Sequence, residues 1–192
     1  MAFPQHRPLS LTDYLSADDD TRWELIEGQV YDMSPAPTLR HQALSGRVHV
    51  SLMNSLREHR TGGGGAPPEC RVFAAPVDVV LNPTTAVQPD VIVVCDPAKL
   101  ANGRYVDGAP DLVIEILSSN TAKKDRLTKR LAYQAAGVPE YLIIDPAANT
   151  LEQYLLDSGI YPAPNVFAPE DTLHLHLLPE VELALAEWFA EP

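Results

Sequence analysis

The chain has 192 residues, 45% of them hydrophobic, which is enough for one domain with a buried core. Its formal net charge of -12 argues against a protein that coats nucleic acid nonspecifically, because such binding depends on Lys and Arg. No stretch approaches the roughly 18 uninterrupted apolar residues of a membrane span, and the N-terminus lacks a basic segment followed by an apolar run. We therefore expect one cytoplasmic domain over residues 1–192, with no membrane association.

The first part of the chain predicts a short helix, a hairpin and a long helix. Ser10 can cap a helix over SLTDYL, and WELIEGQVYDM predicts two short strands that turn at Gly28. The glycine-rich stretch at 61–69 is a surface loop by composition. Before it, a helix from about Thr38 to Arg60 has one apolar face that must pack on another element: Leu44, Val48, Leu52 and Leu56.

The middle of the chain predicts three strands. Two of them, at 72–81 and 90–95, are joined by NPTTAVQP, whose prolines and asparagine exclude a helix and indicate a hairpin-like connection. Residues 96–110 contain Asn-Gly and Asp-Gly pairs and predict a loop. The segment DLVIEIL, at 111–117, is too apolar to leave either face in water, so we expect it at the centre of the sheet.

The two cysteines, Cys70 and Cys95, are too few for a disulfide framework. Cys95 lies in the apolar run VIVVC, where a small buried side chain is expected. A catalytic thiol is therefore not expected.

The last third of the chain predicts a helix followed by a crossover strand. SSNT at 118–121 supplies several possible N-caps for a helix through KKDRLTKRLAYQAAG, which Gly137 ends. EYLIID at 140–145 then predicts a strand, and the tail adds two strands and a closing helix. The order from residue 38 to 145 is thus helix, three strands, helix, strand, in an α/β (α+β) fold.

Two carboxylates fall on successive predicted strands. Asp90 begins one of them, and Glu115 shares a face of the next with Val113 and Leu117, because side chains alternate along a strand. If the strands are neighbours, both carboxylates can point into one cavity. An ionised carboxylate on a central apolar strand is costly to bury unless it is paired or bound to a metal. We therefore expect Asp90 and Glu115 to hold Mg²⁺ or Mn²⁺.

The following helix carries two stripes of residues spaced four apart. Asp125, Lys129 and Tyr133 form one stripe, which could flank the strand end where Glu115 points. A lysine there would complement a phosphate or a metal-bound hydroxide. The other stripe can pack on the sheet: Leu127, Leu131 and Ala135.

The same helix is the one basic part of an acidic chain. Residues 121–133 contain five basic residues and one acid, a local charge of +4. Three of these residues are candidate contacts for a nucleic-acid backbone: Lys123, Lys124 and Arg126. The structural alternative is that they simply form the solvated start of the helix.

Several segments resemble one protein family. PDLVIEILSSNTAKKDRLTKRLAYQAAGVPEYLIIDP is similar to the signature of the Uma-two family of proposed restriction endonucleases, assigned to the PD-(D/E)xK nuclease superfamily. Further blocks match the family's pattern, so that the resemblance covers most of the chain: WELIEGQVYDMSPAP followed by Arg40-His41, QPDVIVV, and the tail LLPEVELALAEWF. The resemblance implies a restriction-endonuclease-like αβββαβ core with a mixed central sheet, an N-terminal β-hairpin, and C-terminal strands plus a helix.

The resemblance also implies roles for single residues. Asp90 matches the first metal-binding aspartate of the superfamily, and Glu115 matches its second acid. Leu117 stands where the superfamily motif has lysine, and Lys129 matches the recurring helical lysine of this family. Two more residues fall on family-pattern positions as supporting members of the site: Glu24 and His41.

Each candidate residue also has a structural interpretation. Asp90 can be a strand-entry cap, and a buried pair with Lys129 or Arg104 would explain Glu115 without catalysis. Lys129 and Asp125 can form an i,i+4 surface pair. His41, at a helix start, is more often a capping or solvent-facing residue than a ligand.

The sequence leaves two functions open. The first is metal-dependent hydrolysis of DNA phosphodiester bonds, in which Asp90, Glu115 and the backbone carbonyl of Ile116 hold the ion and Lys129 stabilises developing charge. Double-strand cleavage by such a single-site enzyme would favour a homodimer. The second is a catalytically silent binding or assembly module, which Leu117 and the charge of -12 favour. A nucleotide-binding domain is disfavoured, because the chain lacks a G-x-G-x-x-G or Walker A loop.

Overall fold

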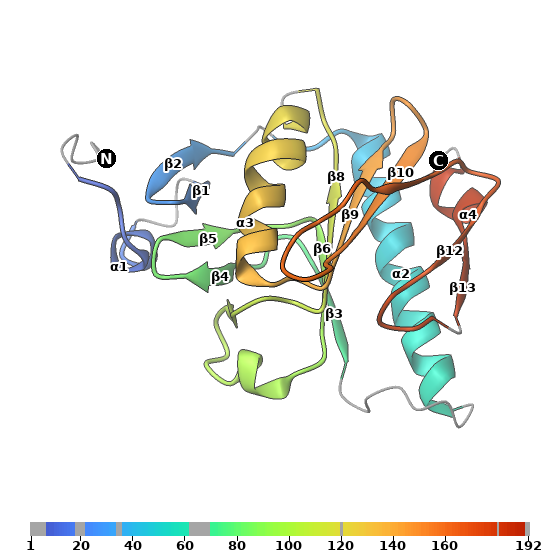
Figure 1. Ribbon diagram of the computed structural model, residues 1–192, viewed down its shortest axis with the longest axis horizontal. Helices are drawn as coiled ribbons and strands as arrows, with labels where there is room; N and C mark the ends of the chain where they lie inside the picture. The colour runs from blue at the N-terminus through green and yellow to red at the C-terminus, as the bar shows by residue number, and fades with distance from the viewer. Residues whose placement is uncertain are drawn as a thin grey trace.

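The structure is a computed structural model that describes residues 7–17, 22–33, 36–61, 70–119, 121–179 and 181–190 (Figure 1). Its helical elements are α1 (Leu11–Leu15), α2 (Leu39–Thr61), the 3₁₀ turn η1 (Pro97–Leu100), the π-helical segment η2 (Lys124–Lys129), α3 (Arg130–Ala136) and α4 (Leu185–Phe189). None of the helices in these ranges is long and apolar enough to cross a bilayer.

The strands form three sheets. The largest has the order β11-β10-β9-β8-β6-β3, with β3 (Arg71–Ala74), β6 (Val91–Val94), β8 (Leu112–Ile116), β9 (Glu140–Asp145), β10 (Thr150–Leu155) and β11 (Asn165–Phe167). A second has the order β2-β1-β5-β4-β7, with β1 (Trp23–Ile26), β2 (Gln29–Asp32), β4 (Val79–Asn82), β5 (Thr85–Val87) and β7 (Val106–Asp107). The third pairs β12 (Thr172–His174) with β13 (Glu182–Ala184).

The element order confirms the expected core. In chain order α2, β3, β6, β8, η2–α3 and β9 give the αβββαβ arrangement. The large sheet is mixed, because β8 pairs with β9 in parallel and with β6 in antiparallel fashion. The hairpin β1–β2 turns at Gly28, and strands and α4 follow the core, as predicted.

Several short segments differ from the prediction. The expected strand at 72–81 is two strands in different sheets, because Pro76 has no N–H to continue the ladder. NPTTAVQP is not only a connection, since it contains β5, and the loop at 96–110 contains η1 and β7. The tail has four strands rather than two. Most of the predicted glycine-rich loop, 62–69, lies outside the described residues.

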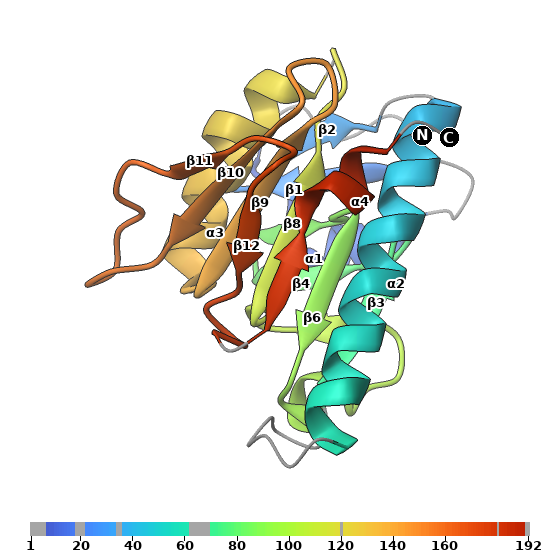
Figure 2. The ribbon, with the colours of Figure 1, turned by 90° about the vertical axis from the view of Figure 1, so that its right-hand side faces the viewer.

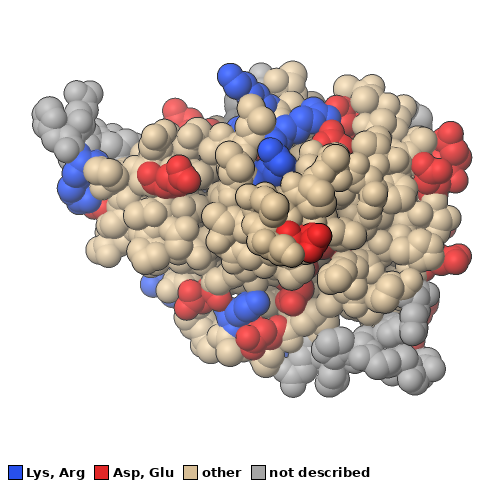
Figure 3. Space-filling model, viewed as in Figure 1, with Lys and Arg blue, Asp and Glu red and all other residues tan. Residues whose placement is uncertain are grey.

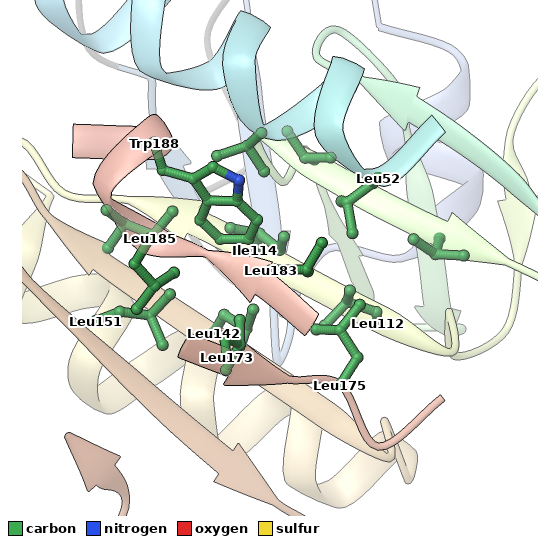
Figure 4. Close-up of a cluster of buried hydrophobic side chains, with 14 of the residues drawn as sticks. Leu52, Leu112, Ile114, Leu142, Leu151, Leu173, Leu175, Leu183, Leu185 and Trp188 are labelled. Atoms are coloured by element: carbon green, nitrogen blue, oxygen red, sulfur yellow. The ribbon is translucent and has the colours of Figure 1, made fainter. Parts of the chain in front are cut away.

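The long helix α2 covers one face of the large sheet (Figure 2). Its predicted apolar face is buried there, together with alternate residues of β6, β8 and β9. The β12–β13 pair and α4 complete this layer, and Trp188 of α4 lies between α2 and the strands (Figure 4). The core residues of this layer drawn in Figure 4 include Leu52, Leu112, Ile114, Leu142, Leu173 and Leu185.

The other face of the large sheet packs against η2 and α3 and against the five-stranded sheet. Here the predicted packing of the helix is wrong. Leu127 and Leu131 are 49% and 52% exposed, whereas the polar stripe of Asp125, Lys129 and Tyr133 is buried against the sheet. Fully burying a leucine gains about 1.5–3 kcal/mol, which is less than the cost of leaving a buried carboxylate without a partner. The carboxylate of Glu115 therefore decides which stripe faces inward.

The cysteines also differ from the expectation. Cys70 and Cys95 form a disulfide with an S–S distance of 2.00 Å, so Cys95 is not a free buried side chain. The pair follows from strand register, because Arg71 of β3 lies opposite Val94 of β6. Both sulfurs are engaged in this disulfide, so neither is a free thiol in this structure.

Candidate active site

Asp90 and Glu115 come from neighbouring antiparallel strands. In β6 and β8, Val91 pairs with Ile114, and the same register continued by one residue puts Asp90 opposite Glu115. The Asp90 carboxylate accepts a hydrogen bond of 2.7 Å from the backbone N–H of Ile116. The condition for convergence of the two carboxylates, that their strands be neighbours, is therefore met.

Glu115 is buried and bonded by two side chains of the facing helix. Its Oε1 lies 2.6 Å from Lys129 Nζ and accepts a 2.7 Å hydrogen bond from the Tyr133 hydroxyl. Burial raises the pKa of Glu115 well above its ordinary value and outweighs the opposite effect of Lys129, while the charges of Asp125 and Asp90 raise the pKa further. A positive charge beside this carboxylate would therefore be strongly favourable.

Glu24 joins the site from β1 of the five-stranded sheet. Its completely buried carboxylate lies 2.5 Å from Lys124 Nζ and 2.7 Å from Lys129 Nζ, and accepts a 3.0 Å hydrogen bond from the backbone N–H of Gln88. Burial acts to raise the pKa of Glu24, but the two lysines outweigh it, so the pKa is lowered. Glu24 is therefore an ionised partner of both lysines.

The π-helical form of η2 explains how both lysines reach Glu24. In an α-helix, residues five apart point about 140° away from each other. A π-helix bonds i to i+5, which brings Lys124 and Lys129 to one side. π-Helical segments of this kind are frequent at functional sites.

Lys129 is held by carboxylates on several sides. Besides Glu115 and Glu24, it lies 4.0 Å from Asp125 Oδ1 on its own helix. Burial acts to lower the pKa of Lys129, but the charges of Glu115, Glu24 and Asp125 outweigh it and raise the pKa well above its ordinary value. Lys129 is therefore a permanently charged ammonium group.

His41 contacts Asp90 and Ile116 from the first turn of α2. Its Nε2 lies 3.3 Å from Asp90 Oδ2 and 3.1 Å from the backbone oxygen of Ile116. Burial acts to lower the pKa of His41, but the hydrogen bond and the charge of Asp90 outweigh it, so the pKa is raised. His41 is thus not solvent-facing, because its ring points to this pair.

Two of the three basic residues predicted to contact nucleic acid form ion pairs within the molecule. Lys124 is paired with Glu24, and Arg126 is paired with Asp145 at 3.1 Å and Glu152 at 2.8 Å. Lys123 is exposed. On the face drawn in Figure 3, the basic groups lie beside acidic ones within a mainly neutral surface.

Sequence reasoning missed the part played by Gln88. Besides its backbone bond to Glu24, its side-chain amide donates a 2.8 Å hydrogen bond to Asp78, which also accepts one of 2.7 Å from the Tyr14 hydroxyl. The position of Gln88 just before the Pro89–Asp90 pair was the one available signal. Its partners come from distant segments and are not deducible from local pattern.

The charges of the site suit a divalent cation. Four carboxylates, those of Glu24, Asp90, Glu115 and Asp125, face two ammonium groups, those of Lys124 and Lys129. With all four carboxylates ionised, the negative charges exceed the ammonium charges by two, and His41, whose pKa is raised, offsets one of them when it is protonated. The described residues contain no group of three or more His, Cys, Asp and Glu side chains that could hold a metal ion. An ion here would thus also need the Ile116 carbonyl and water as ligands.

The comparisons with known proteins agree with this fold. A crystal structure of a "putative nuclease belonging to DUF820" from Anabaena variabilis ATCC 29413 superposes with a TM-score of 0.75 at 20% identity, over 95% of this chain and 98% of that one. It confirms the restriction-endonuclease-like core. No curated protein matches the chain. The sequence model of the Uma2 family, described as "Putative restriction endonuclease", matches residues 10–186. The chain therefore belongs to the Uma2 family.

Proposed function

We propose that the protein is a metal-dependent endonuclease that hydrolyses DNA phosphodiester bonds, and that one domain spanning residues 1–192 carries the activity. The observation that carries the proposal is the approach of Lys129 to Glu115, at 2.6 Å, on the strand next to Asp90. Two acids and a lysine form the active-site pattern of the PD-(D/E)xK nuclease superfamily, which the sequence resembles. The family description, a restriction endonuclease, supports DNA as the substrate.

Lys129 takes the place of the lysine that is missing at position 117. Leu117 is buried in the core beneath α3, and the lysine reaches the acid from the helix instead. Because its pKa is raised, Lys129 stays protonated and cannot act as a general base. Because its buried Nζ is bonded to Glu115 and Glu24, its role is to supply positive charge close to a scissile phosphate.

Asp90, Glu115 and the Ile116 carbonyl would hold Mg²⁺ or Mn²⁺. When bound, such an ion lowers the pKa of a water molecule and stabilises charge on the phosphate. The chain's own residues prepare this site: Ile116 N–H fixes one oxygen of Asp90, and Tyr133 fixes one oxygen of Glu115. Asp125 and Glu24 hold the lysine against the acid.

The substrate would approach from the basic end of the helix. Lys123 is exposed there and is the candidate contact whose charge faces solvent. Lys124 acts instead on Glu24, inside the site. A homodimer would present two such sites to the two strands of a duplex, and analytical ultracentrifugation with and without DNA tests this arrangement.

A catalytically silent binding module is the second candidate function. The observation that favours it is the same ion pair, because Lys129 already neutralises Glu115 without a metal. Such a module would keep the pair for stability alone. Its partner binding would survive loss of Asp90.

Cleavage of supercoiled plasmid with Mg²⁺ or Mn²⁺ tests the proposal. The wild type should nick or linearise the plasmid, and Asp90→Ala, Glu115→Ala and Lys129→Met should each abolish the reaction. The exposed Glu170→Gln is the matched control, which should cleave like the wild type. No cleavage by the wild type, with no Mg²⁺ or Mn²⁺ binding in calorimetry, would reject the enzymatic function and favour the silent module.

A further inference from the structure

The outer face of α2 carries a stripe of exposed residues opposite its buried face. Six residues spaced three or four apart form this outer stripe: Leu39, Gln42, Gly46, Val50, Met53 and Arg57. Three of them are large apolar residues, with Leu39 88%, Val50 56% and Met53 52% exposed. β3, β6 and α4 pack against the other side of the helix, which lies at the edge of the molecule in Figure 2. The outer stripe is thus apolar surface that the described part of the chain leaves open to a partner.

Gly46 lies at the centre of the outer stripe without a reason within the described part of the chain. Glycine in the middle of a helix is destabilising relative to alanine, because it loses more backbone freedom on folding. A Cβ added at Gly46 would meet no described atom within 4 Å, so the packing of the monomer does not require glycine there. The missing side chain lets a second helix approach closely at this point. A partner helix would therefore explain the glycine.

The outer stripe is symmetric about Gly46. Leu39 and Met53 each stand seven residues from it, about 10 Å along the helix axis. If two α2 helices crossed in antiparallel orientation at Gly46, Leu39 of each copy would meet Met53 of the other, and Val50 would lie beside the glycine of the other copy. Such reciprocal contacts are those of a two-fold dimer. A second copy of the chain is therefore the partner that fits the outer stripe.

The charges of α2 favour an antiparallel pair and disfavour nucleic acid as the partner. Residues 42–54 contain one charged residue, Arg47, whose guanidinium donates hydrogen bonds to the backbone oxygens of Trp188 and Ala190 at 3.2 and 2.5 Å. Nucleic-acid binding draws its affinity from Lys and Arg, which the middle of the outer stripe lacks. A parallel pair would bring Arg57 of both copies together, whereas an antiparallel pair separates these like charges.

We propose that the outer stripe of α2 is a homodimer interface, where the helices of two copies cross in antiparallel orientation at Gly46. The inference rests on the proposed function for the use of the dimer, and it adds the surface through which two nuclease sites would be joined. His41, which contacts Asp90, lies in the first turn of the same helix. α2 thus connects the interface to the candidate active site.

Disulfide cross-linking tests the crossing point. Gly46→Cys should form a covalent dimer on oxidation with diamide, because the two cysteines would lie close together at the two-fold axis. Met53→Cys alone should not, since its two copies would be about 21 Å apart along the helix axis. A mixture of Leu39→Cys and Met53→Cys should form a mixed dimer, because these positions meet across the interface. The native Cys70 and Cys95 are already joined to each other.

The exposed Glu170→Cys is the control for cross-linking by random collision. A yield of covalent dimer from Gly46→Cys no higher than from Glu170→Cys would overturn the inference. Cross-linking of Met53→Cys as efficient as that of Gly46→Cys would indicate a parallel pair and would also overturn it. Alkylation of Gly46→Cys by a maleimide should slow as the protein concentration rises. Slowing only on addition of duplex DNA would assign the outer stripe to nucleic acid instead.

Sedimentation tests the interface without introduced cysteines. The wild type should form dimers as its concentration rises, and Met53→Arg should stay monomeric. Leu127→Arg is the matched control, because Leu127 is 49% exposed on a different helical element and should leave the dimer intact.

Gly46→Ala separates the interface from the stability of the monomer. It should weaken self-association by roughly tenfold, because the added methyl groups meet at the crossing point. The resistance of the monomer to urea should stay the same or rise, since alanine favours a helix. A wild type that stays monomeric, or a dimer that survives Met53→Arg and is lost in Leu127→Arg, would reject the interface.

Plasmid cleavage separates this inference from the proposed function. If the wild type nicks plasmid but stays monomeric, the interface is rejected and the metal-dependent function stands. If it dimerises through Gly46 but neither binds Mg²⁺ or Mn²⁺ nor cleaves, the interface stands and the nuclease function is rejected. If both hold, Met53→Arg should still nick the plasmid but linearise it less than the wild type does.

Discussion

Lys129 Nζ lies 2.7 Å from Glu24 Oε1, so the helix that carries the proposed catalytic lysine is bonded to a strand of the other sheet. The N-terminal hairpin is therefore part of the site and not an appendage to the nuclease core. Because Lys129 also contacts Glu115 at 2.6 Å, one ammonium group joins β1 of the five-stranded sheet to β8 of the six-stranded sheet. The geometry of the site thus depends on how the two sheets pack.

Replacing Glu24 with glutamine should destabilise the protein strongly. Glu24→Gln removes the negative charge shared by the buried Lys129 and the half-buried Lys124, so both ammonium groups keep less compensation. Loss of one partner of a buried ion pair costs about 3–5 kcal/mol. Urea denaturation should show this decrease in the free energy of unfolding, whereas the exposed Glu170→Gln should change it by less than about 0.5 kcal/mol. A loss below about 1 kcal/mol in Glu24→Gln would mean that the ion pairs contribute little.

Repeating patterns made much of the fold predictable. The four-residue spacing of Leu44 to Leu56 predicted the buried face of α2, and Gly137 ends α3 in the left-handed conformation as expected. The alternation in β8 predicted that Glu115 shares a face with Val113 and Leu117, and this face packs against η2 and α3. Two short strands were missed, because β5 and β7 have three and two residues and no clear periodicity, and β3 and β4 were predicted as one strand.

The orientation of η2 and α3 could not be predicted from local pattern. An apolar stripe normally faces the core, and this rule assumes that the sheet beneath is apolar. Here the sheet presents Glu115, and Glu24 approaches from the second sheet, so the polar stripe satisfies them. The π-helical form that aligns Lys124 with Lys129 is likewise a tertiary effect. The candidate acids and the pairing of Glu115 with Lys129 were thus predictable, but the contact of Glu24 with both lysines was not.

Because Leu131 lies on the exposed face of α3, Leu131→Ala should have a small effect on the free energy of unfolding. Leu131 is 52% exposed, and alanine favours a helix, so the free energy of unfolding should change by less than about 1 kcal/mol. Leu142→Ala, at a completely buried position of β9, should cost about 2–5 kcal/mol by comparison. Both values come from urea titrations of purified variants. A loss in Leu131→Ala as large as that in Leu142→Ala would show that this stripe is covered in solution.

We expect the titration of Glu140 to increase the free energy of unfolding as the pH falls from neutrality. Its buried carboxylate accepts hydrogen bonds from Gln153 at 2.7 Å and from the backbone N–H of His176 at 2.9 Å. Burial raises the pKa of Glu140 above the ordinary value of 4.5 and outweighs these bonds. Between 4.5 and the raised value, the folded state binds more protons than the unfolded state, so a lower pH stabilises the fold.

The variant Glu140→Gln isolates this effect. Its free energy of unfolding, measured from pH 7 to 4.5, should rise less with falling pH than that of the wild type. Part of the slope should remain, because the pKa values of Glu115 and Asp125 are also raised. Glu170→Gln should keep the whole wild-type slope, and identical slopes in all three proteins would show that Glu140 titrates normally.

Gly28 combines two reasons to be glycine, and a matched variant separates them. Its φ of +75° is left-handed, and an added Cβ would lie 2.6 Å from Pro8 Cβ. Gly103 has a similar φ of +68°, but an added Cβ there would meet nothing within 4 Å. Gly103→Ala should therefore lower the free energy of unfolding by about 1–2 kcal/mol, the cost of a left-handed backbone conformation for alanine. Gly28→Ala should lower the free energy of unfolding by the same backbone cost and by about 1–3 kcal/mol more, because the segment before α1 must move away from the hairpin. Thermal and urea unfolding measure the difference, and equal losses in the two variants would show that the Pro8 contact adjusts freely.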